Sequence, residues 1–183
     1  MLINKQEPFE RKNNMKAIGT TNLNTQRLIL RKIKKEDAES LFSFGILGEN
    51  LEDATNIINN MVQCNDDPMT FHWALEYEGI AIGRIKGWEV DPHNNFVQLG
   101  YDIGVPYRGK GLMTEAVKAV SKYLLKECEF NRVYCMVRES NPASNRVCEK
   151  AGMKHEGFLR NHWIQGDGSY TNVHYWGLLS SDI

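Results

Sequence analysis

The chain has 183 residues, of which 42% are hydrophobic and 25% are charged, and these values indicate one ordinary globular domain with a substantial core. Its formal net charge of -1 gives no general attraction to nucleic acid or to a membrane surface, and no segment approaches the roughly 20 apolar residues of a spanning helix. The four cysteines and five histidines lack metal-site or disulfide-framework spacing, so we expect a reducing, cytoplasmic setting and no metal.

Residues 1–24 are polar and rich in Lys and Asn, and they lack the apolar segment of a secretory signal. We therefore expect residues 1–24 to form a mobile N-terminal extension and residues 25–183 to form a single domain. Met15 is an alternative start of the chain.

Apolar spacing predicts the elements of the N-terminal half. Residues 27–33 are expected to form a strand, and residues 36–44 and 49–63 are expected to form two short helices. Residues 70–77 and 80–88 then form a predicted hairpin around a Glu-Gly turn.

The stretch 96–115 is typical of a strand, a glycine-rich turn and the start of a helix. Pro106 cannot continue a central strand, and Gly109 and Gly111 permit backbone conformations that other residues resist. From Met113 onward, apolar residues recur at helical spacing. The first turn of a helix has unpaired amide groups and lies at the positive end of the helix dipole. The glycine-rich turn followed by a helix therefore predicts an anion site.

The same turn comes within one residue of a nucleotide-binding P-loop. Gly104, Gly109 and Lys110 match the P-loop spacing, but Gly111 stands where that motif needs Ser or Thr to hold Mg²⁺. A third interpretation is that the glycines only reverse the chain. Both alternatives stay open at this point.

The C-terminal part contains three further strands and one further helix. Residues 131–138 predict a strand beside the one that starts at Phe96. Asn141 and Pro142 are typical of a helix start, and Gly152 is typical of the residue after a helix end.

Residues 157–163 and 170–178 are the expected terminal strands, and the whole order of elements indicates an α+β fold with a mixed sheet. Four aromatic residues of these strands are expected in the core, with a substrate groove as the alternative. They are Trp163, Tyr170, Tyr175 and Trp176.

Several motifs in a fixed order resemble one family. Residues 107–111 (YRGKG), followed by a helix, resemble the acetyl-CoA pyrophosphate loop of the GCN5-related N-acetyltransferases (GNAT). Residues 25–38, 131–133, 141–153 and 156–160 are similar to the RimJ/RimL-like branch, which acetylates the N-termini of ribosomal proteins. The resemblance covers most of the chain and implies the GNAT fold, a mixed and mostly antiparallel central sheet flanked by helices, with acetyl-CoA as the acetyl donor.

The resemblance also implies which residues bind the cofactor. Backbone amides of the loop hold the pyrophosphate, and the pantetheine arm lies between two strands that splay apart. Pro106 stands where many members have Gln or Arg, which removes one side-chain contact. The implied cofactor-binding residues are Ile103, Val105, Arg108, Gly109, Lys110, Gly111, Leu112, Met113, Asn141, Ser144 and Asn145.

Attack on the thioester of acetyl-CoA requires a neutral amine. A free α-amino group has a pKa near 8 and is mostly protonated at neutral pH, so a carboxylate base usually removes the proton. Many members have Glu where this chain has Gln98, which cannot act as a base but can position water. Asp102 and Glu89 are therefore the two candidate bases. The resemblance places Ser144 near the CoA sulfur, and it places Cys148 where other branches have a tyrosine acid.

These inferences predict an N-acetyltransferase in which a primary amine, the α-amine of a ribosomal or other protein, attacks acetyl-CoA directly. One alternative is a small acceptor such as a polyamine, an amino sugar or an antibiotic. Another is a CoA-binding module that has lost turnover, because Gln98 replaces the expected carboxylate. The resemblance implies a homodimer, and neither nucleic acid nor a membrane is an expected partner.

Overall fold

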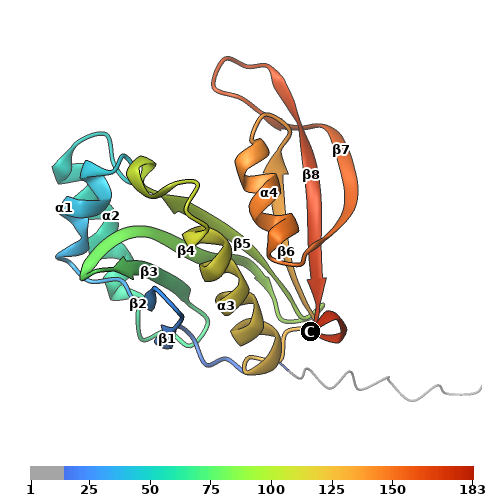
Figure 1. The fold of residues 1–183 in the computed structure, drawn as a ribbon, viewed down its shortest axis with the longest axis horizontal. Coiled ribbons are helices and arrows are strands. Elements are labelled where there is room, and N and C mark those ends of the chain that lie inside the picture. Colours follow the sequence, from blue (N-terminus) through green and yellow to red (C-terminus); the bar gives the residue numbers. More distant parts are fainter. Residues whose placement is uncertain (1–14) are drawn as a thin grey trace, which may run out of the picture.

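The computed structural model describes residues 15–183, which form an eight-stranded sheet with helices on both faces (Figure 1). The strands are β1 (Leu23–Asn24), β2 (Ile29–Lys32), β3 (Phe71–Tyr77), β4 (Ile80–Asp91), β5 (Phe96–Ile103), β6 (Arg132–Arg138), β7 (Lys154–Ile164) and β8 (Tyr170–Leu179). The helices are α1 (Asp37–Ser43), α2 (Leu51–Gln63), α3 (Leu112–Lys126) and α4 (Pro142–Lys150).

The strand order is β1-β2-β3-β4-β5-β6-β8-β7. Strands β5 and β6 run parallel, and the other neighbouring pairs are antiparallel. This confirms the predicted mixed, mostly antiparallel sheet and the hairpin of β3 and β4. No helix in residues 15–183 combines the length and the apolar character needed to cross a bilayer.

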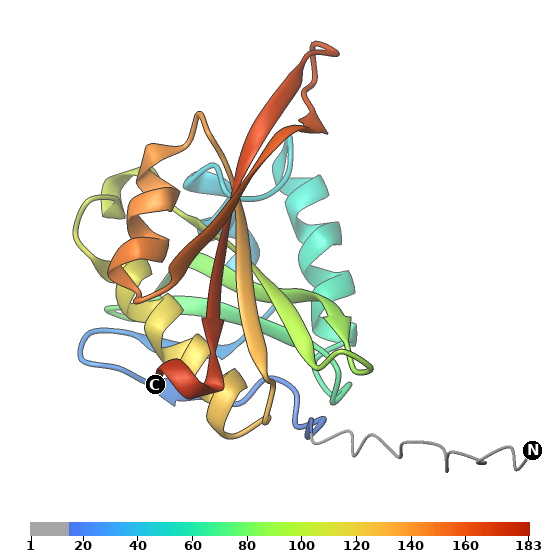
Figure 2. The ribbon, with the colours of Figure 1, turned by 90° about the vertical axis from the view of Figure 1, so that its right-hand side faces the viewer.

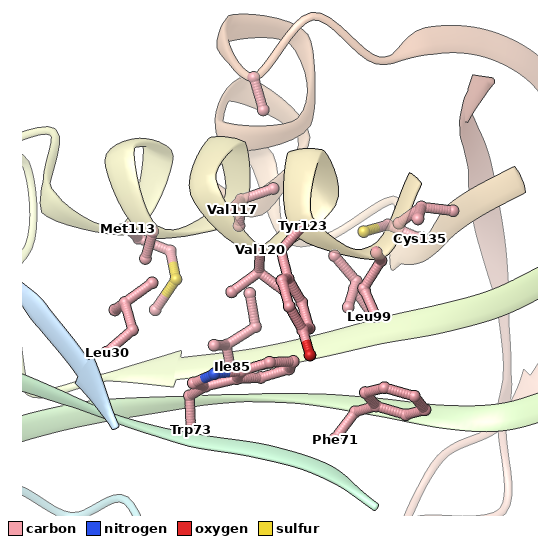
Figure 3. Packing of buried hydrophobic residues seen from close by; sticks show 14 of the residues in the cluster. Leu30, Phe71, Trp73, Ile85, Leu99, Met113, Val117, Val120, Tyr123 and Cys135 are labelled. Atoms are coloured by element: carbon pink, nitrogen blue, oxygen red, sulfur yellow. The ribbon is translucent and has the colours of Figure 1, made fainter. Parts of the chain in front are cut away.

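The main core lies between α3 and the central strands (Figure 3). Because side chains alternate along a strand, Phe71 and Trp73 of β3 point to the same face, and both are fully buried. Tyr123 of α3 packs edge-on against Trp73, with ring centroids 5.9 Å apart. A second cluster lies under α1 and α2 on the opposite face and includes Ala74 of β3.

The chain before β2 packs against this core. The Tyr123 hydroxyl donates a hydrogen bond to the carbonyl of Gly19 at 2.7 Å, and the indole of Trp73 donates to the carbonyl of Thr21 at 2.7 Å. Thr20 is buried. Residues 19–24 therefore belong to the folded domain and not to the predicted mobile extension. The buried phenol and indole groups need the carbonyl oxygens of this segment as hydrogen-bond acceptors. Residues 1–14 of that extension lie outside the described residues.

Glu115 in the first turn of α3 connects this helix to the segment before β2. Its carboxylate accepts hydrogen bonds from the Thr25 hydroxyl at 2.6 Å and from the Arg27 backbone and guanidinium, each at 2.8 Å. The same guanidinium donates to the carbonyl of Lys110 at 2.9 Å. Glu115 and Arg27 therefore support the loop that precedes α3.

Replacing Glu115 by Gln should lower the free energy of unfolding by about 1–2 kcal/mol at pH 7, because charge-assisted hydrogen bonds are lost. Burial acts to raise the pKa of Glu115, but the hydrogen bonds from Thr25 and Arg27 outweigh it and lower the pKa. This stabilisation is thus present above the unfolded pKa of about 4.3 and disappears as the pH falls through the lower folded value. Urea denaturation should show the difference shrinking in acid, and a pH-independent difference would contradict this explanation.

Strands β7 and β8 extend as a long hairpin beyond the rest of the sheet (Figure 2). The predicted core position is wrong for Tyr170, which is 63% exposed, because the end of the hairpin has no layer packed against it. Trp163, Tyr175 and Trp176 are only partly buried. These aromatic residues therefore lie at the border of the core.

Candidate active site

The two central parallel strands diverge after three paired positions. Residues 96–98 of β5 pair with residues 132–134 of β6, and beyond them β5 continues beside β4 while β6 continues beside β8. Figure 1 shows the two halves of the sheet spreading apart between α3 and α4. This confirms the predicted adjacency and splaying. Residues 99–103 of β5 thus have an edge without a neighbouring strand. On this edge the Ile103 carbonyl accepts a hydrogen bond from Arg108 Nε at 3.2 Å, and other main-chain groups are available to bind an extended ligand.

A cavity of about 400 Å³ lies at this divergence. It is lined by the end of β5, the loop before α3, and the start of α4. Eight of the predicted cofactor residues line it: Ile103, Arg108, Gly109, Gly111, Leu112, Met113, Asn141 and Ser144. The cavity therefore gathers both halves of the predicted cofactor motif, which are separated by about thirty residues of sequence.

Three predicted cofactor residues lie outside the lining of the cavity. Val105 is 64% exposed and belongs to a short 3-10 turn, Val105–Tyr107, whereas the apolar run 96–105 predicts that it belongs to the strand, which ends at Ile103. The Lys110 ammonium lies over the ring of Tyr107 at 5.5 Å from its centroid. Asn145 accepts a hydrogen bond from the Trp176 indole at 2.8 Å.

The loop before α3 has the backbone geometry of an anion site. Gly109 and Gly111 have φ values of +74° and +77°, which side-chain-bearing residues rarely adopt. Gly111 is the N-cap of α3 and provides no side-chain hydrogen bond to the helix. The first amides of α3 are consequently left for a ligand, and Arg108 adds positive charge beside them.

The start of α4 has the predicted cap. The Asn141 side chain accepts a hydrogen bond from the Ser144 backbone amide at 3.0 Å, and Pro142 occupies the first helical position. Capping accounts for Asn141 without a ligand. It also fixes the first turn of α4, and Ser144 lies in that turn and faces the cavity.

Sequence reasoning missed Tyr101, which also lines the cavity. Its hydroxyl lies 2.8 Å from Ser144 Oγ and 3.3 Å from Cys148 Sγ. Strand alternation places Tyr101 on the face covered by α3, opposite to Gln98, and this was the signal available in the sequence. Cys148 is fully buried, as expected for a small apolar side chain.

The candidate bases lie on the other face of the sheet. Because β5 has no bulge between Gln98 and Asp102, these two residues share a face. Tyr134, which pairs with Gln98 across β5 and β6, donates a hydrogen bond from its hydroxyl to Glu89 Oε2 at 3.0 Å. Burial, together with the Glu89 carboxylate, raises the pKa of Tyr134, so the phenol remains a donor.

Glu89 has an unusual backbone conformation. Its φ is +48°, and it lies at a bulge where the pairing of β4 with β5 shifts between Trp88 and Asp91. Bulges redirect side chains, and strained backbone is common at functional sites. The bulge allows the exposed Glu89 to reach Tyr134, two strands away.

Asp102 and Gln98 differ in their surroundings. The Asp102 carboxylate pairs with the Arg84 guanidinium at 3.1 Å, and its side chain is 51% exposed. Gln98 is buried, and its Oε1 has no hydrogen-bond partner within the described part of the chain. Of the two candidate bases, Glu89 thus contacts Tyr134, the partner of Gln98, and it makes no ion pair within residues 15–183, whereas Asp102 is paired with Arg84.

The structure brings together two histidines that the sequence did not pair. His155 Nε2 of β7 and His174 Nδ1 of β8 are 2.9 Å apart. Residues 15–183 contain no group of three or more His, Cys, Asp or Glu side chains arranged to hold a metal ion.

A sheet that opens beside a helix start without a side-chain cap is consistent with an acetyltransferase that takes its acetyl group from acetyl-CoA. The sequence profile of the acetyltransferase (GNAT) domain matches residues 27–154, and the chain belongs to this family.

Relatives and solved structures agree with this assignment. An uncharacterized N-acetyltransferase of Bacillus subtilis, YoaA, is 28% identical over 166 residues, which cover 83% of this chain and 94% of the relative. A ribosomal-protein-serine acetyltransferase of Escherichia coli is 24% identical and covers 70% of this chain and 71% of its own length. A solved structure of RimL, a ribosomal L7/L12 α-N-protein acetyltransferase in complex with coenzyme A, has a TM-score of 0.77 at 15% identity, covers 87% of this chain and 98% of its own, and shows the shared fold.

Proposed function

We propose that this protein acetylates the N-terminal α-amine of a ribosomal or other protein by direct attack of the amine on acetyl-CoA. The observation that carries the proposal is the cavity between the diverging strands, with the start of α3 at one end and Ser144 beside it. The similarity to a ribosomal-protein-serine acetyltransferase supports a protein acceptor.

Acetyl-CoA binds in this proposal through groups of β5, α3 and α4. The loop amides of Gly109 and Gly111 and the start of α3 hold the pyrophosphate, because unpaired amides and the helix dipole favour an anion. The pantetheine arm runs along the free edge of β5, past Ile103, toward the place where β5 and β6 meet. The thioester then lies near Ser144.

The acceptor amine approaches from the sheet face that carries Gln98, Glu89 and Tyr134. Glu89 takes the proton of the amine, directly or through a water molecule, and the hydroxyl of Tyr134 holds the carboxylate in place. The unpartnered Gln98 carbonyl accepts a hydrogen bond from the amine or from that water. The nitrogen attacks the carbonyl carbon, the C–S bond breaks, and the sulfur keeps the electron pair.

Calorimetric titration tests the cofactor site. Acetyl-CoA should bind saturably, and Mg-ATP should not bind, because Gly111 provides no hydroxyl for the metal. Binding of Mg-ATP without binding of acetyl-CoA would instead support the P-loop interpretation.

A thiol-release assay with a panel of amines tests the acceptor. Peptides with a free N-terminal serine should react, whereas the same peptides with an acetylated N-terminus should not. Faster turnover of a polyamine, an amino sugar or an aminoglycoside would favour the small-molecule alternative. Acetyl-CoA binding without turnover of any amine would favour the non-catalytic alternative.

The setting and the assembly of the protein are further parts of the proposal. The four cysteines are free thiols, which suits a reducing, cytoplasmic setting. A homodimer remains a prediction that sedimentation would test.

A further inference from the structure

The Tyr101 hydroxyl lies within hydrogen-bond distance of Ser144 Oγ in the cavity that the proposed function assigns to the cofactor. It comes from β5, on the opposite side of the cavity from α4, and its distance to Ser144 Oγ is 2.8 Å. The two side chains therefore meet between β5 and α4, beside the place that the proposed function gives to the thioester.

The contact between the two hydroxyls can run in either direction, and the neighbours of the phenol favour Tyr101 as the donor. The phenol has one proton and three neighbours: Ser144 Oγ at 2.8 Å, the Ser144 carbonyl at 3.3 Å and Cys148 Sγ at 3.3 Å. The carbonyl lies within α4, where helical hydrogen bonding uses it, and sulfur is a weak acceptor. The Tyr101 hydroxyl therefore donates its hydrogen bond to Ser144 Oγ, and the Ser144 hydroxyl can donate its own hydrogen bond to another acceptor.

We infer that Tyr101 is a positioning residue for the leaving group: its hydroxyl donates to Ser144 Oγ and thereby directs the Ser144 proton toward the sulfur of CoA. This inference rests on the proposed function. As the C–S bond breaks, the sulfur takes the electron pair and receives the Ser144 hydrogen bond. The proton that the amine lost then reaches the thiolate through solvent.

The surroundings of Tyr101 suit a donor that keeps its proton. Burial, together with the nearby thiols of Cys135 and Cys148, raises the pKa of the Tyr101 phenol. The phenol therefore stays neutral through the reaction and acts through Ser144. Cys148 is small and fully buried, and a larger side chain at that position would occupy the space of the phenol oxygen.

The test measures the pKa of the CoA thiol in the complex, so it needs no acceptor. Thiolate absorbance of the CoA complex is followed against pH, with the complex of desulfo-CoA as the blank. Replacing Tyr101 by Phe should raise the pKa of the bound thiol by about one unit, a tenfold change in ionisation, because a hydrogen bond to the thiolate weakens. Ser144→Ala should raise it by at least as much, and the double variant should match Ser144→Ala because the two residues act as one unit.

Tyr123→Phe is the matched control. It also removes a buried phenol that donates a hydrogen bond, here to the Gly19 carbonyl, away from the cavity. Tyr123→Phe should leave the pKa of the bound thiol unchanged. In steady-state kinetics with a reactive peptide from the panel, Tyr101→Phe should lower kcat without changing KM for acetyl-CoA.

Three results would overturn the inference. The first is an unchanged thiol pKa in Tyr101→Phe, and the second is additive effects on the thiol pKa in the double variant. If Tyr101→Phe does not fold, the third is an unchanged thiol pKa in Ser144→Ala. A wild-type protein that binds no CoA would overturn both the inference and the proposed function. A wild-type protein that binds CoA, with a thiol pKa insensitive to these variants, would overturn the inference alone.

Discussion

Replacing Gly109 by Glu is expected to weaken acetyl-CoA binding by about 100-fold. Gly109 lies in the loop before α3, and no atom lies within 4 Å of a Cβ placed on it, so the new side chain meets open space rather than protein. A carboxylate there stands next to the proposed pyrophosphate site, and two like charges about 4 Å apart repel by roughly 4 kcal/mol near a protein surface. Calorimetric titration with acetyl-CoA measures the loss.

Gly168→Glu is the control for the Gly109 variant. Gly168 has a φ of +83°, it also faces open space, and it lies in the turn between β7 and β8. The backbone strain and the added charge are therefore the same in both variants, but only Gly109 is near the cavity. Equal acetyl-CoA affinity in the two variants would count strongly against the proposed pyrophosphate loop.

Glu89→Gln should lower kcat by about 100- to 1,000-fold, because the variant loses the proposed base but keeps a similar shape. KM for acetyl-CoA should change little, since Glu89 lies on the sheet face opposite to α3 and outside the lining of the cavity. Tyr134→Phe should lower kcat by a smaller factor, about tenfold, through loss of the hydrogen bond that orients Glu89. Steady-state kinetics with a reactive peptide from the panel measures both effects.

Glu78→Gln is the matched control for the Glu89 variant. Glu78 also has a left-handed backbone, with φ of +50°, and it lies in the turn between β3 and β4, so its replacement should leave kcat unchanged. A loss of activity in Asp102→Asn, together with wild-type activity in Glu89→Gln, would transfer the role of base to Asp102.

The order of elements and the cofactor loop follow from local features of the chain. The spacing of apolar residues predicts α3, and glycines at two positions with positive φ predict the turn before it. Asn141 and Gly152 mark the two ends of α4 because caps depend on neighbours within one helical turn. Local rules of this kind can be read without knowing which strands become neighbours.

The proposed catalytic part of the site depends on contacts that no local rule describes. Tyr101 meets Ser144 across the divergence of β5 and β6, and Glu89 meets Tyr134 across an intervening strand. Each pair requires the strand order and the register, and the second also requires a one-residue irregularity in β4. A shift of register by one residue would turn each side chain to the other face, so strand patterns alone could not select Glu89 over Asp102.

By itself, the sequence determined the family, the order of elements and the glycine turn before α3, because these depend on motifs and on periodicity over a few residues. Only the tertiary structure decided that residues 19–24 are packed, that Tyr101 joins the cavity and that Glu89 meets Tyr134. The physical reason is that these contacts join residues about 40 to 100 positions apart, and the pairing and bulges of a single twisted sheet determine which of them meet.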